Sequence, residues 1–297
     1  MTSSYESAKA QFTDSIFQAL APYKERIEPA ISASISRLGE KTPLRDACEY
    51  ALQTGGKRFR PALVYMIADG LKSKIDVTDA ALAVEFFHTA SLIADDLPCM
   101  DNDDFRRGRP TTHKVFGEAV ALLASFSLIA AGFECVATNS EKRRDLCQVA
   151  LWHASRLNGI HALIGGQYID LYPPELDRQK LYEIMEKKTV SLFELSFLLG
   201  WIFSDGDLSQ IKEVQKAAFH FGSAFQIIDD LDDLKKDLEA GRKANFALLF
   251  GVEEAIKAVK MHTEAFSCLL EQLKIQSHSL KLLAEGMSTL ASAFEKS

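Results

Sequence analysis

Two clusters of closely spaced aspartates have the composition of a binding site for a divalent cation. The first follows an apolar segment and places five aspartates within the ten residues 95–104. In the second, Asp229 and Asp233 are four residues apart and therefore share one face of a helix. Short carboxylates are the hard oxygen ligands that Mg²⁺ prefers, whereas like charges on one helical face destabilise a metal-free helix. Together the clusters predict bound Mg²⁺, although one cluster alone is equally well explained as a solvated, acidic helix end.

Two other carboxylate metal sites fit the spacing less well. Neither cluster has the alternating ligands, the glycine and the distant glutamate of an EF-hand loop. A di-iron carboxylate bundle needs two Glu-x-x-His pairs, and only Glu85 and His88 provide one. Magnesium therefore remains the predicted ion.

Three short basic segments carry the opposite charge, at residues 55–61, 106–110 and 187–189. Guanidinium and ammonium groups beside metal-loaded carboxylates form a site for a diphosphate. Each segment taken singly is more often a set of surface salt bridges. The glycines at 55, 56 and 108, however, allow the backbone to approach a ligand closely, which favours anion binding.

The elements that position these clusters are predicted to be helices. Apolar residues recur at spacings of three and four along almost the whole chain, and no segment shows the alternation and turn residues of a hairpin. There is no internal repeat and no long Gly/Ser linker. The sequence thus predicts an all-α protein with a single domain over residues 1–297. The expected helices cover residues 12–37, 43–53, 60–71, 78–97, 115–137, 141–170, 178–203, 208–238, 252–273 and 278–294.

Composition excludes several classes of protein. The 297 residues carry a net charge of −7 and are 47% hydrophobic, which argues against a disordered chain and against a general nucleic-acid binder. The five cysteines form no Cys-x-x-Cys pair and indicate a reducing compartment. The longest uncharged apolar stretch, residues 119–133, is shorter than the roughly 20 residues of a membrane span and is expected to be a buried helix. With no signal-peptide pattern at the N-terminus, we expect no nucleic-acid partner, no membrane span and a cytoplasmic location.

Five segments of the chain resemble the trans-isoprenyl diphosphate synthases of the polyprenyl synthetase family, which elongate allylic diphosphates. They are GGKRFRP at 55–61, HTASLIADDLPCMDNDDFRRGRPT at 88–111, GGQYIDL at 165–171, KT at 188–189 and FQIIDDLDD at 225–233. The resemblance spans most of the chain and is closest to the short-chain geranylgeranyl and farnesyl diphosphate synthases. It implies an isoprenoid-synthase-type helical bundle around a deep central cavity, and a homodimer.

The resemblance also implies a role for each residue that matches a family motif. Three Mg²⁺ ions would be held by Asp95, Asp96, Asp101, Asp229, Asp230 and Asp233. Isopentenyl diphosphate would be bound by Lys57, Arg60, His88 and Arg107. The allylic diphosphate and its cation would be bound by Arg106, Lys188, Thr189, Gln226 and Lys243. Metal charge would stabilise the departing diphosphate, after which the alkene of isopentenyl diphosphate would attack the allylic cation and a proton would be lost.

Three of these assignments have alternatives. His88 lies seven residues before Asp95 and therefore on the same helical face, but a lone histidine on an apolar helix is usually a hydrogen-bonded core residue. Asp170 is equally well explained as a structural partner of a basic residue. Lys243 follows Asp233 after a shorter loop than the family usually has, so that Lys236 or Arg242 could take its role.

The residues before Asp95 predict the length of the product. Ala90 and Ser91 are small, whereas farnesyl-making relatives carry a large aromatic residue at the position of Ala90. Phe86 and Phe87 lie one further turn away, about 5 Å along the helix, and could close the end of the tail cavity. The expected product is geranylgeranyl diphosphate, with farnesyl diphosphate as the alternative.

Two alternatives to a prenyl synthase remain. A terpene cyclase uses the same ionisation but needs no second diphosphate site. A non-catalytic partner subunit would be expected to have lost one of the aspartate clusters, and both are intact.

Overall fold

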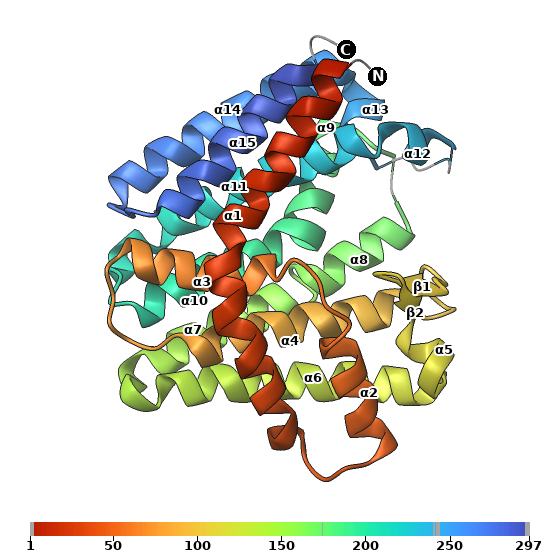
Figure 1. Cartoon of the computed structure of the whole chain (residues 1–297), viewed down its shortest axis with the longest axis vertical. Coiled ribbons are helices and arrows are strands. Elements are labelled where there is room, and N and C mark those ends of the chain that lie inside the picture. Colours follow the sequence, from red (N-terminus) through yellow and green to blue (C-terminus); the bar gives the residue numbers. More distant parts are fainter. Residues whose placement is uncertain (1–2, 174, 240, 242–243, 295–297) are drawn as a thin grey trace.

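The computed structural model describes residues 3–173, 175–239, 241 and 244–294. Helices make up nearly all of the regular structure in this part of the chain (Figure 1). The prediction of an all-α fold is confirmed. The only strands among the described residues are β1 (Phe105–Arg106) and β2 (Arg109–Pro110), which pair as an antiparallel hairpin. Strands of two residues are too short to show an alternating pattern, so this hairpin was not predicted.

The helices follow one another with short connections. In chain order they are α1 (Ser3–Ser34), η1 (Ile35–Leu38), α2 (Pro43–Leu52), α3 (Phe59–Gly70), α4 (Thr78–Asp95), α5 (Thr112–Phe116), α6 (Glu118–Asn139), η2 (Ser140–Lys142), α7 (Arg144–Asn158), α8 (Leu163–Leu171), α9 (Arg178–Ile184), η3 (Met185–Val190), α10 (Ser191–Phe203), η4 (Leu208–Gln210), α11 (Ile211–Asp232), α12 (Leu234–Glu239), α13 (Phe246–Phe250), α14 (Val252–Gln272) and α15 (His278–Phe294).

Several predicted helices are divided in the structure. Gly117 separates α5 from α6 because its φ of 84° does not continue a helix. The predicted helix over residues 141–170 breaks between α7 and α8, near Gly159. The predicted helix over residues 178–203 contains η3, a π-helical turn that joins α9 to α10. Helix α13 was not predicted.

The core is centred on α3, α4, α10 and α11. Every residue of α10 except Glu194 is buried, and α10 packs against α3, α4 and α11. The rings of Phe59, Phe193 and Phe221, from α3, α10 and α11, lie 5.7–6.0 Å apart. At Gly200 the α10 backbone approaches α3 so closely that a Cβ atom would lie 2.8 Å from the Val64 carbonyl oxygen. This packing fixes the ends of α4 and α11, where the two aspartate clusters lie.

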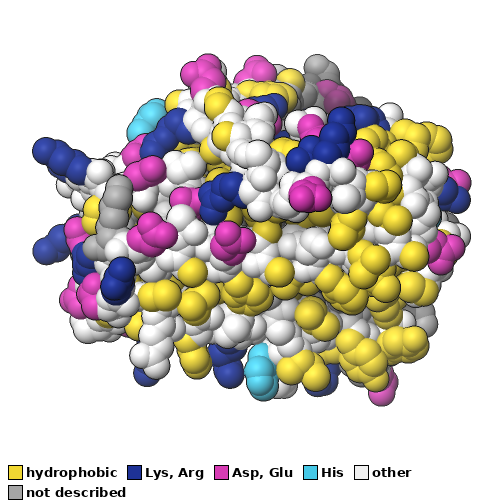
Figure 2. All heavy atoms as spheres, turned by 90° about the horizontal axis from the view of Figure 1, so that it is seen from below, with side chains coloured by type: hydrophobic (Ala, Val, Ile, Leu, Met, Phe, Trp, Pro, Cys, Tyr) yellow, Lys and Arg dark blue, Asp and Glu magenta, His cyan; other side chains and the backbone are white. Residues whose placement is uncertain are grey.

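Helix α6 has one buried and one exposed apolar face. Its inner residues pack against α4, but Leu122, Leu123 and Phe126 are 41–57% exposed. In Figure 2, which views the molecule from below, hydrophobic side chains gather over much of the visible face. By length and composition α6 could cross a membrane, and 39% of its most apolar window is buried. The expectation of a buried helix over 119–133 is therefore correct for one face only.

Candidate active site

The first aspartate cluster lies where α4 ends. Pro98 cannot continue the helix, and the chain turns so that the Asp101 N–H donates to the Asp95 carbonyl oxygen at 2.9 Å. Burial raises the pKa of Asp95 to about 6, and the negative charge of Asp101 raises it further, whereas Lys188 lowers it. The turn thus brings two carboxylates together in a partly desolvated position.

Asp96 is engaged by an arginine from the hairpin. Arg106 Nε donates to Asp96 Oδ1 at 2.7 Å, and Arg106 Nη2 also donates to that oxygen. Asp96 is 3% exposed, and the same guanidinium reaches Asp103 Oδ2 at 3.1 Å. Arg106 and Asp96 therefore neutralise each other.

The second cluster lies at the C-terminal end of α11. Burial raises the pKa of Asp229 to about 7, and the charges of Asp230 and Asp233 act in the same direction, opposed by Lys57. The carboxylate of Asp230 accepts hydrogen bonds from the Phe246 N–H at 2.7 Å and from Gln226 Nε2 at 2.8 Å. Asp230 therefore ties α11 to α13, whereas the Asp229 side chain is solvent-accessible and makes no side-chain hydrogen bond or ion pair among the described residues.

Asp101 of the first cluster and three aspartates of the second line one cavity of about 540 Å³, whereas Asp95, Asp96 and Arg106 are not in its wall. The predicted site residues in its wall are Asp101, Asp229, Asp230, Asp233, Lys188, Thr189 and Gln226, together with Asp170. Within the described part of the chain, four predicted metal ligands make no side-chain hydrogen bond or ion pair; they are Asp95, Asp101, Asp229 and Asp233. The six predicted ligands thus divide into four free carboxylates and two engaged ones. Lys243 and Arg242 lie outside the described residues, and Lys236 lies in α12.

The donor atoms fit magnesium shared with a ligand. Among the described residues, no three Asp, Glu, His or Cys side chains form a group that could hold an ion without other ligands. Mg²⁺ keeps several waters and is commonly held by one or two carboxylates together with substrate phosphates. Free carboxylates on facing helix ends match that mode of binding. The number of ions stays a prediction.

The Lys188–Thr189 pair stands on the π-helical turn η3, a feature often found at functional sites. Lys188 Nζ donates to Asp170 Oδ2, and Thr189 Oγ1 donates to Gln226 Oε1 at 2.9 Å. Gly166 allows this packing, since a Cβ atom there would lie 2.4 Å from the Lys188 backbone nitrogen. The structure thus favours the structural alternative for Asp170, as the ion-pair partner of Lys188.

A second cavity, of about 310 Å³, collects the four residues predicted to bind isopentenyl diphosphate. Lys57, Arg60, His88 and Arg107 all contribute to its wall. Arg60 Nη1 lies 3.3 Å from His88 Nε2, and its guanidinium carbon lies 4.7 Å from the centre of the Phe193 ring. Burial and the charges of Arg60 and Arg107 hold the pKa of His88 well below its usual value, so the imidazole is neutral and can accept the Arg60 hydrogen bond. The cavity is therefore a concentrated cation site.

Glycines bring Arg107 into this cavity. Arg107 Nη1 donates to the Gly55 carbonyl oxygen. Gly56 has a φ of 122°, and a Cβ atom there would lie 2.5 Å from the guanidinium carbon of Arg107. The sequence suggested that these glycines let the backbone approach a ligand. In the structure the backbone at Gly55 and Gly56 approaches the Arg107 guanidinium instead.

The residues predicted to set chain length lie where α4 packs against α6. Phe86, Phe87 and Ala90 are buried, and Ser125 Oγ donates to the Ala90 carbonyl oxygen at 2.9 Å. The Phe87 ring lies 5.0 Å from Phe133. Ser91 is half-buried on the same helix. Neither the acidic nor the basic cavity has these four residues in its wall.

Sequence reasoning missed the buried partners of the basic segment 55–61. Arg58 donates to Glu85 Oε1 at 2.5 Å, and both side chains are 1% exposed. Glu85 was considered only as half of a metal-binding Glu-x-x-His pair. Its signal in the sequence is a charge on an otherwise apolar helix, which requires a counter-charge from another element.

Two facing acidic helix ends and a separate cation cavity inside an all-α bundle define an enzyme of the isoprenoid-synthase type. The comparisons with known proteins identify the family within that class.

The polyprenyl synthetase family model matches residues 41–246. The chain is 33% identical to the farnesyl diphosphate synthase of Bacillus subtilis (strain 168), covering 92% of this chain and 97% of the relative. It is 36% identical to putative geranylgeranyl pyrophosphate synthase 8, chloroplastic, of Arabidopsis thaliana, covering 83% and 73%. The structure of a geranyltransferase from Legionella pneumophila matches with a TM-score of 0.82 at 28% identity, over 93% and 98% of the two chains. The chain belongs to the polyprenyl synthetase family.

The buried carboxylates make the metal-free protein less stable at neutral pH. Because burial raises the pKa of Asp229 to about 7 and that of Asp95 to about 6, the folded chain retains protons that the unfolded chain releases above pH 4. The free energy of unfolding should therefore fall as the pH rises from about 4 to about 7. Asp229→Asn should make this fall smaller, measured by urea denaturation in EDTA at each pH. Equal pH profiles for the wild type and the variant would contradict the assignment.

Proposed function

We propose that this chain condenses isopentenyl diphosphate with allylic diphosphates and that its main product is geranylgeranyl diphosphate. The observation that carries the proposal is the adjacency of the two cavities. Asp229, in the acidic cavity, is close enough to Lys57 and Arg60, in the basic cavity, for its charge to interact with both. One diphosphate placed over the carboxylates and another placed on the cations would therefore bring their carbon chains together between α4 and α11.

The acidic cavity would bind the allylic substrate. Magnesium, when bound with the diphosphate, would supply positive charge that stabilises the departing group. Lys188 is half-buried and paired with Asp170, and an entering diphosphate would compete with Asp170 for its ammonium group. Thr189 Oγ1 and Gln226 Oε1 are hydrogen-bonded to each other beside this cavity. Their oxygen dipoles could stabilise an allylic cation formed there.

The basic cavity would bind isopentenyl diphosphate. Arg60 is half-buried, and burial lowers its pKa to about 10, so it remains protonated at neutral pH. In a site without bulk water, a cation binds a diphosphate more strongly than it would at the surface. Lys57 and Arg107 add two further cations. A terpene cyclase, which ionises one diphosphate only, would have no use for this cavity.

The product proposal rests on the small side chain of Ala90. Ala90 lies at the α4–α6 contact, one turn from Phe86 and Phe87. We propose that the growing tail runs along the face of α4 that carries Ser91 and Ala90, whose small side chains would leave it room as far as those rings. The relatives named above include both a farnesyl and a geranylgeranyl synthase, so farnesyl diphosphate remains the alternative product.

We further propose that two copies associate through the exposed face of α6. Leu122, Leu123 and Phe126 form this face, and Trp152 on α7 is 55% exposed. Helix α7 packs directly against α6. An exposed apolar surface of this kind marks an association site, and a second copy would cover it by two-fold symmetry.

The activity should be measurable with purified protein. With Mg²⁺, isopentenyl diphosphate and dimethylallyl, geranyl or farnesyl diphosphate in turn, the C20 product should dominate when products are separated by chain length. Asp95→Ala should lower the rate about 100-fold or more, because a proposed metal ligand beside Asp101 of the acidic cavity is lost. The matched control is Asp14→Ala, at an exposed aspartate of α1. Full turnover by Asp95→Ala would show that the acidic cavity is misassigned.

A large residue at position 90 should shorten the product. Ala90→Tyr places a ring beside Phe87 and should shift the main product from C20 to C15, measured with farnesyl and geranyl diphosphates as starters. Ala90→Ser is the size control. Because a larger residue in a packed contact commonly costs about 1–3 kcal/mol, thermal unfolding of both variants must be followed. A folded Ala90→Tyr enzyme that still makes C20 would remove Ala90 from the explanation.

The association proposal predicts a mass of two chains of 32.9 kDa in light scattering coupled to size exclusion. Phe126→Glu should give single chains, because a charge is placed in the centre of the apolar face. Phe17→Glu, at a 61% exposed phenylalanine of α1, should leave the mass unchanged. A wild-type protein that runs as single chains at micromolar concentration would refute the proposed dimer.

A further inference from the structure

Arg58 connects three helices beneath the basic cavity. Its Nη1 donates to Glu85 Oε1 of α4 at 2.5 Å, and its Nη2 donates to the carbonyl oxygen of Leu52, the last residue of α2, at 2.6 Å. Its Nε donates to Glu28 Oε1 of α1 at 2.9 Å. The side chains of Arg58 and Glu85 are 1% exposed, and that of Glu28 is 38% exposed. One guanidinium thus fixes α1, α2 and α4 relative to the segment that carries it.

The backbone of Arg58 is as constrained as its side chain. Its φ of 52° and ψ of 38° are left-handed, a conformation that costs a residue with a Cβ atom about 1 kcal/mol or more. Arg58 directly precedes the first residue of α3. This turn separates Lys57 from Arg60, and both side chains reach the basic cavity. The hydrogen bonds of the guanidinium therefore hold the turn that orients the two cations.

The network borders the basic cavity directly. Arg58 and Glu85 are both part of its wall. The second oxygen of Glu85, Oε2, is buried and has no hydrogen-bond partner among the described residues. Its charge raises the pKa of Arg60 and of Arg107. Glu85 is also three residues before His88 on α4, so it links the turn to the helix that carries His88 and Asp95.

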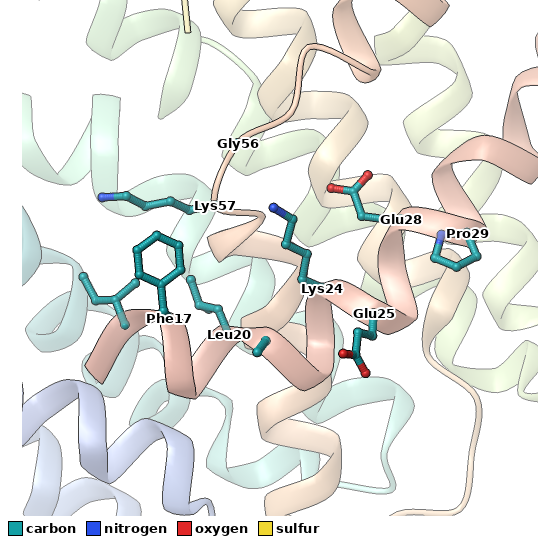
Figure 3. A pocket seen from close by; sticks show the side chains of 10 residues that line it. Phe17, Leu20, Lys24, Glu25, Glu28, Pro29, Gly56 and Lys57 are labelled. Atoms are coloured by element: carbon teal, nitrogen blue, oxygen red, sulfur yellow. The ribbon is translucent and has the colours of Figure 1, made fainter. Parts of the chain in front are cut away.

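The other end of the network opens toward a third cavity. This cavity, of about 760 Å³, lies between α1 and the Gly56–Lys57 segment, with Phe17, Lys24 and Glu28 in its wall (Figure 3). The Lys57 side chain projects over Phe17, and the Glu28 carboxylate points from α1 toward the chain segment above it (Figure 3). Glu28 is therefore the solvent-facing anchor of Arg58, whereas Glu85 is the buried one.

We propose that Arg58 is a positioning residue for the second diphosphate, acting through its ion pair with Glu85 to hold Lys57 and Arg60 in their binding orientation. This role rests on the proposed function. Arg58 does not itself need to touch the substrate, since its donors are already used by Glu28, Leu52 and Glu85. Its loss should affect the binding of isopentenyl diphosphate and leave the acidic cavity, which holds the allylic diphosphate, nearly unchanged.

The test compares Arg58→Met with the double variant Arg58→Met/Glu85→Gln. Removing the arginine alone leaves Glu85 buried and unpaired, which is strongly destabilising, whereas neutralising both partners is tolerated better. The double variant should fold with a thermal midpoint close to that of the wild type. We expect its KM for isopentenyl diphosphate to rise about tenfold or more, with its KM for the allylic diphosphate and its kcat changed less than about threefold.

Two controls separate positioning from a general loss of stability. Arg26→Met removes another arginine that joins α1 to α3, through Asp69 at 3.2 Å, far from the cavity wall; its KM values should not change. Glu85→Gln removes the charge of the buried partner but keeps an acceptor for Arg58, so its KM for isopentenyl diphosphate should lie between those of the wild type and the double variant. An unchanged KM in the folded double variant, or an equal rise in both KM values, would overturn the positioning role.

A binding measurement keeps this test independent of turnover. Calorimetric titration with inorganic pyrophosphate in EDTA reads the cation cavity alone. Weaker binding to the double variant than to Arg26→Met supports the positioning role even if the wild type makes no prenyl product, in which case only the proposed function fails. Equal binding to both variants would refute the role of Arg58 whatever the enzyme makes.

Discussion

The cost of holding charges away from water governs the arrangement of this protein. A charged group inside a helical bundle is tolerated only when a counter-charge or hydrogen bonds compensate for the lost hydration. Several charges near the centre are compensated within the chain, as in the pairs Asp96–Arg106, Asp170–Lys188 and Glu85–Arg58. Burial raises the pKa of Asp95 to about 6 and that of Asp229 to about 7, and neither makes a side-chain ion pair among the described residues. The unpaired carboxylates of Asp101, Asp229 and Asp233 line the acidic cavity and are the ones available to a ligand.

Paired and unpaired charges have different functions in this arrangement. The paired groups join elements that are distant in the sequence, such as α4 to the hairpin through Asp96 and α8 to η3 through Asp170. Asp230 does the same for α11 and α13, by accepting the Phe246 N–H while Asn245 donates to its carbonyl oxygen. Asp96 and Asp230 are thus acids that sequence motifs group with the metal ligands but that hold neighbouring segments in place. The same acidic motif thus contains carboxylates that are available to bind metal and carboxylates that hold neighbouring segments in place.

The sequence allowed the helical class and the family to be predicted, together with the four residues that line the basic cavity and several that line the acidic one. Periodicity identifies which face of a segment is apolar, and the motifs identify residues that converge, such as Lys57, Arg60 and His88. The partner of each charge could not be predicted, because Arg106 and Lys188 could each pair with several nearby acids. The break between α5 and α6 depends on the positive φ of Gly117. It was not predicted, because the residues on both sides of Gly117 favour a helix. The exposed face of α6 was not predicted, because a helix that is apolar on all sides gives no indication of which side packs against the rest of the protein.

The π-helical turn η3 fixes the number of residues between the acidic cavity and α10. It places Lys188 and Thr189 beside the acidic cavity, and α10, which is buried on every side, begins directly after it. Each residue of an α-helix turns the chain by about 100°. Insertion or deletion of a single residue within η3 would therefore rotate the whole of α10 against α3 and α11, and the close approach at Gly200 would be lost. Evolution can change the side chains of this turn far more easily than its length.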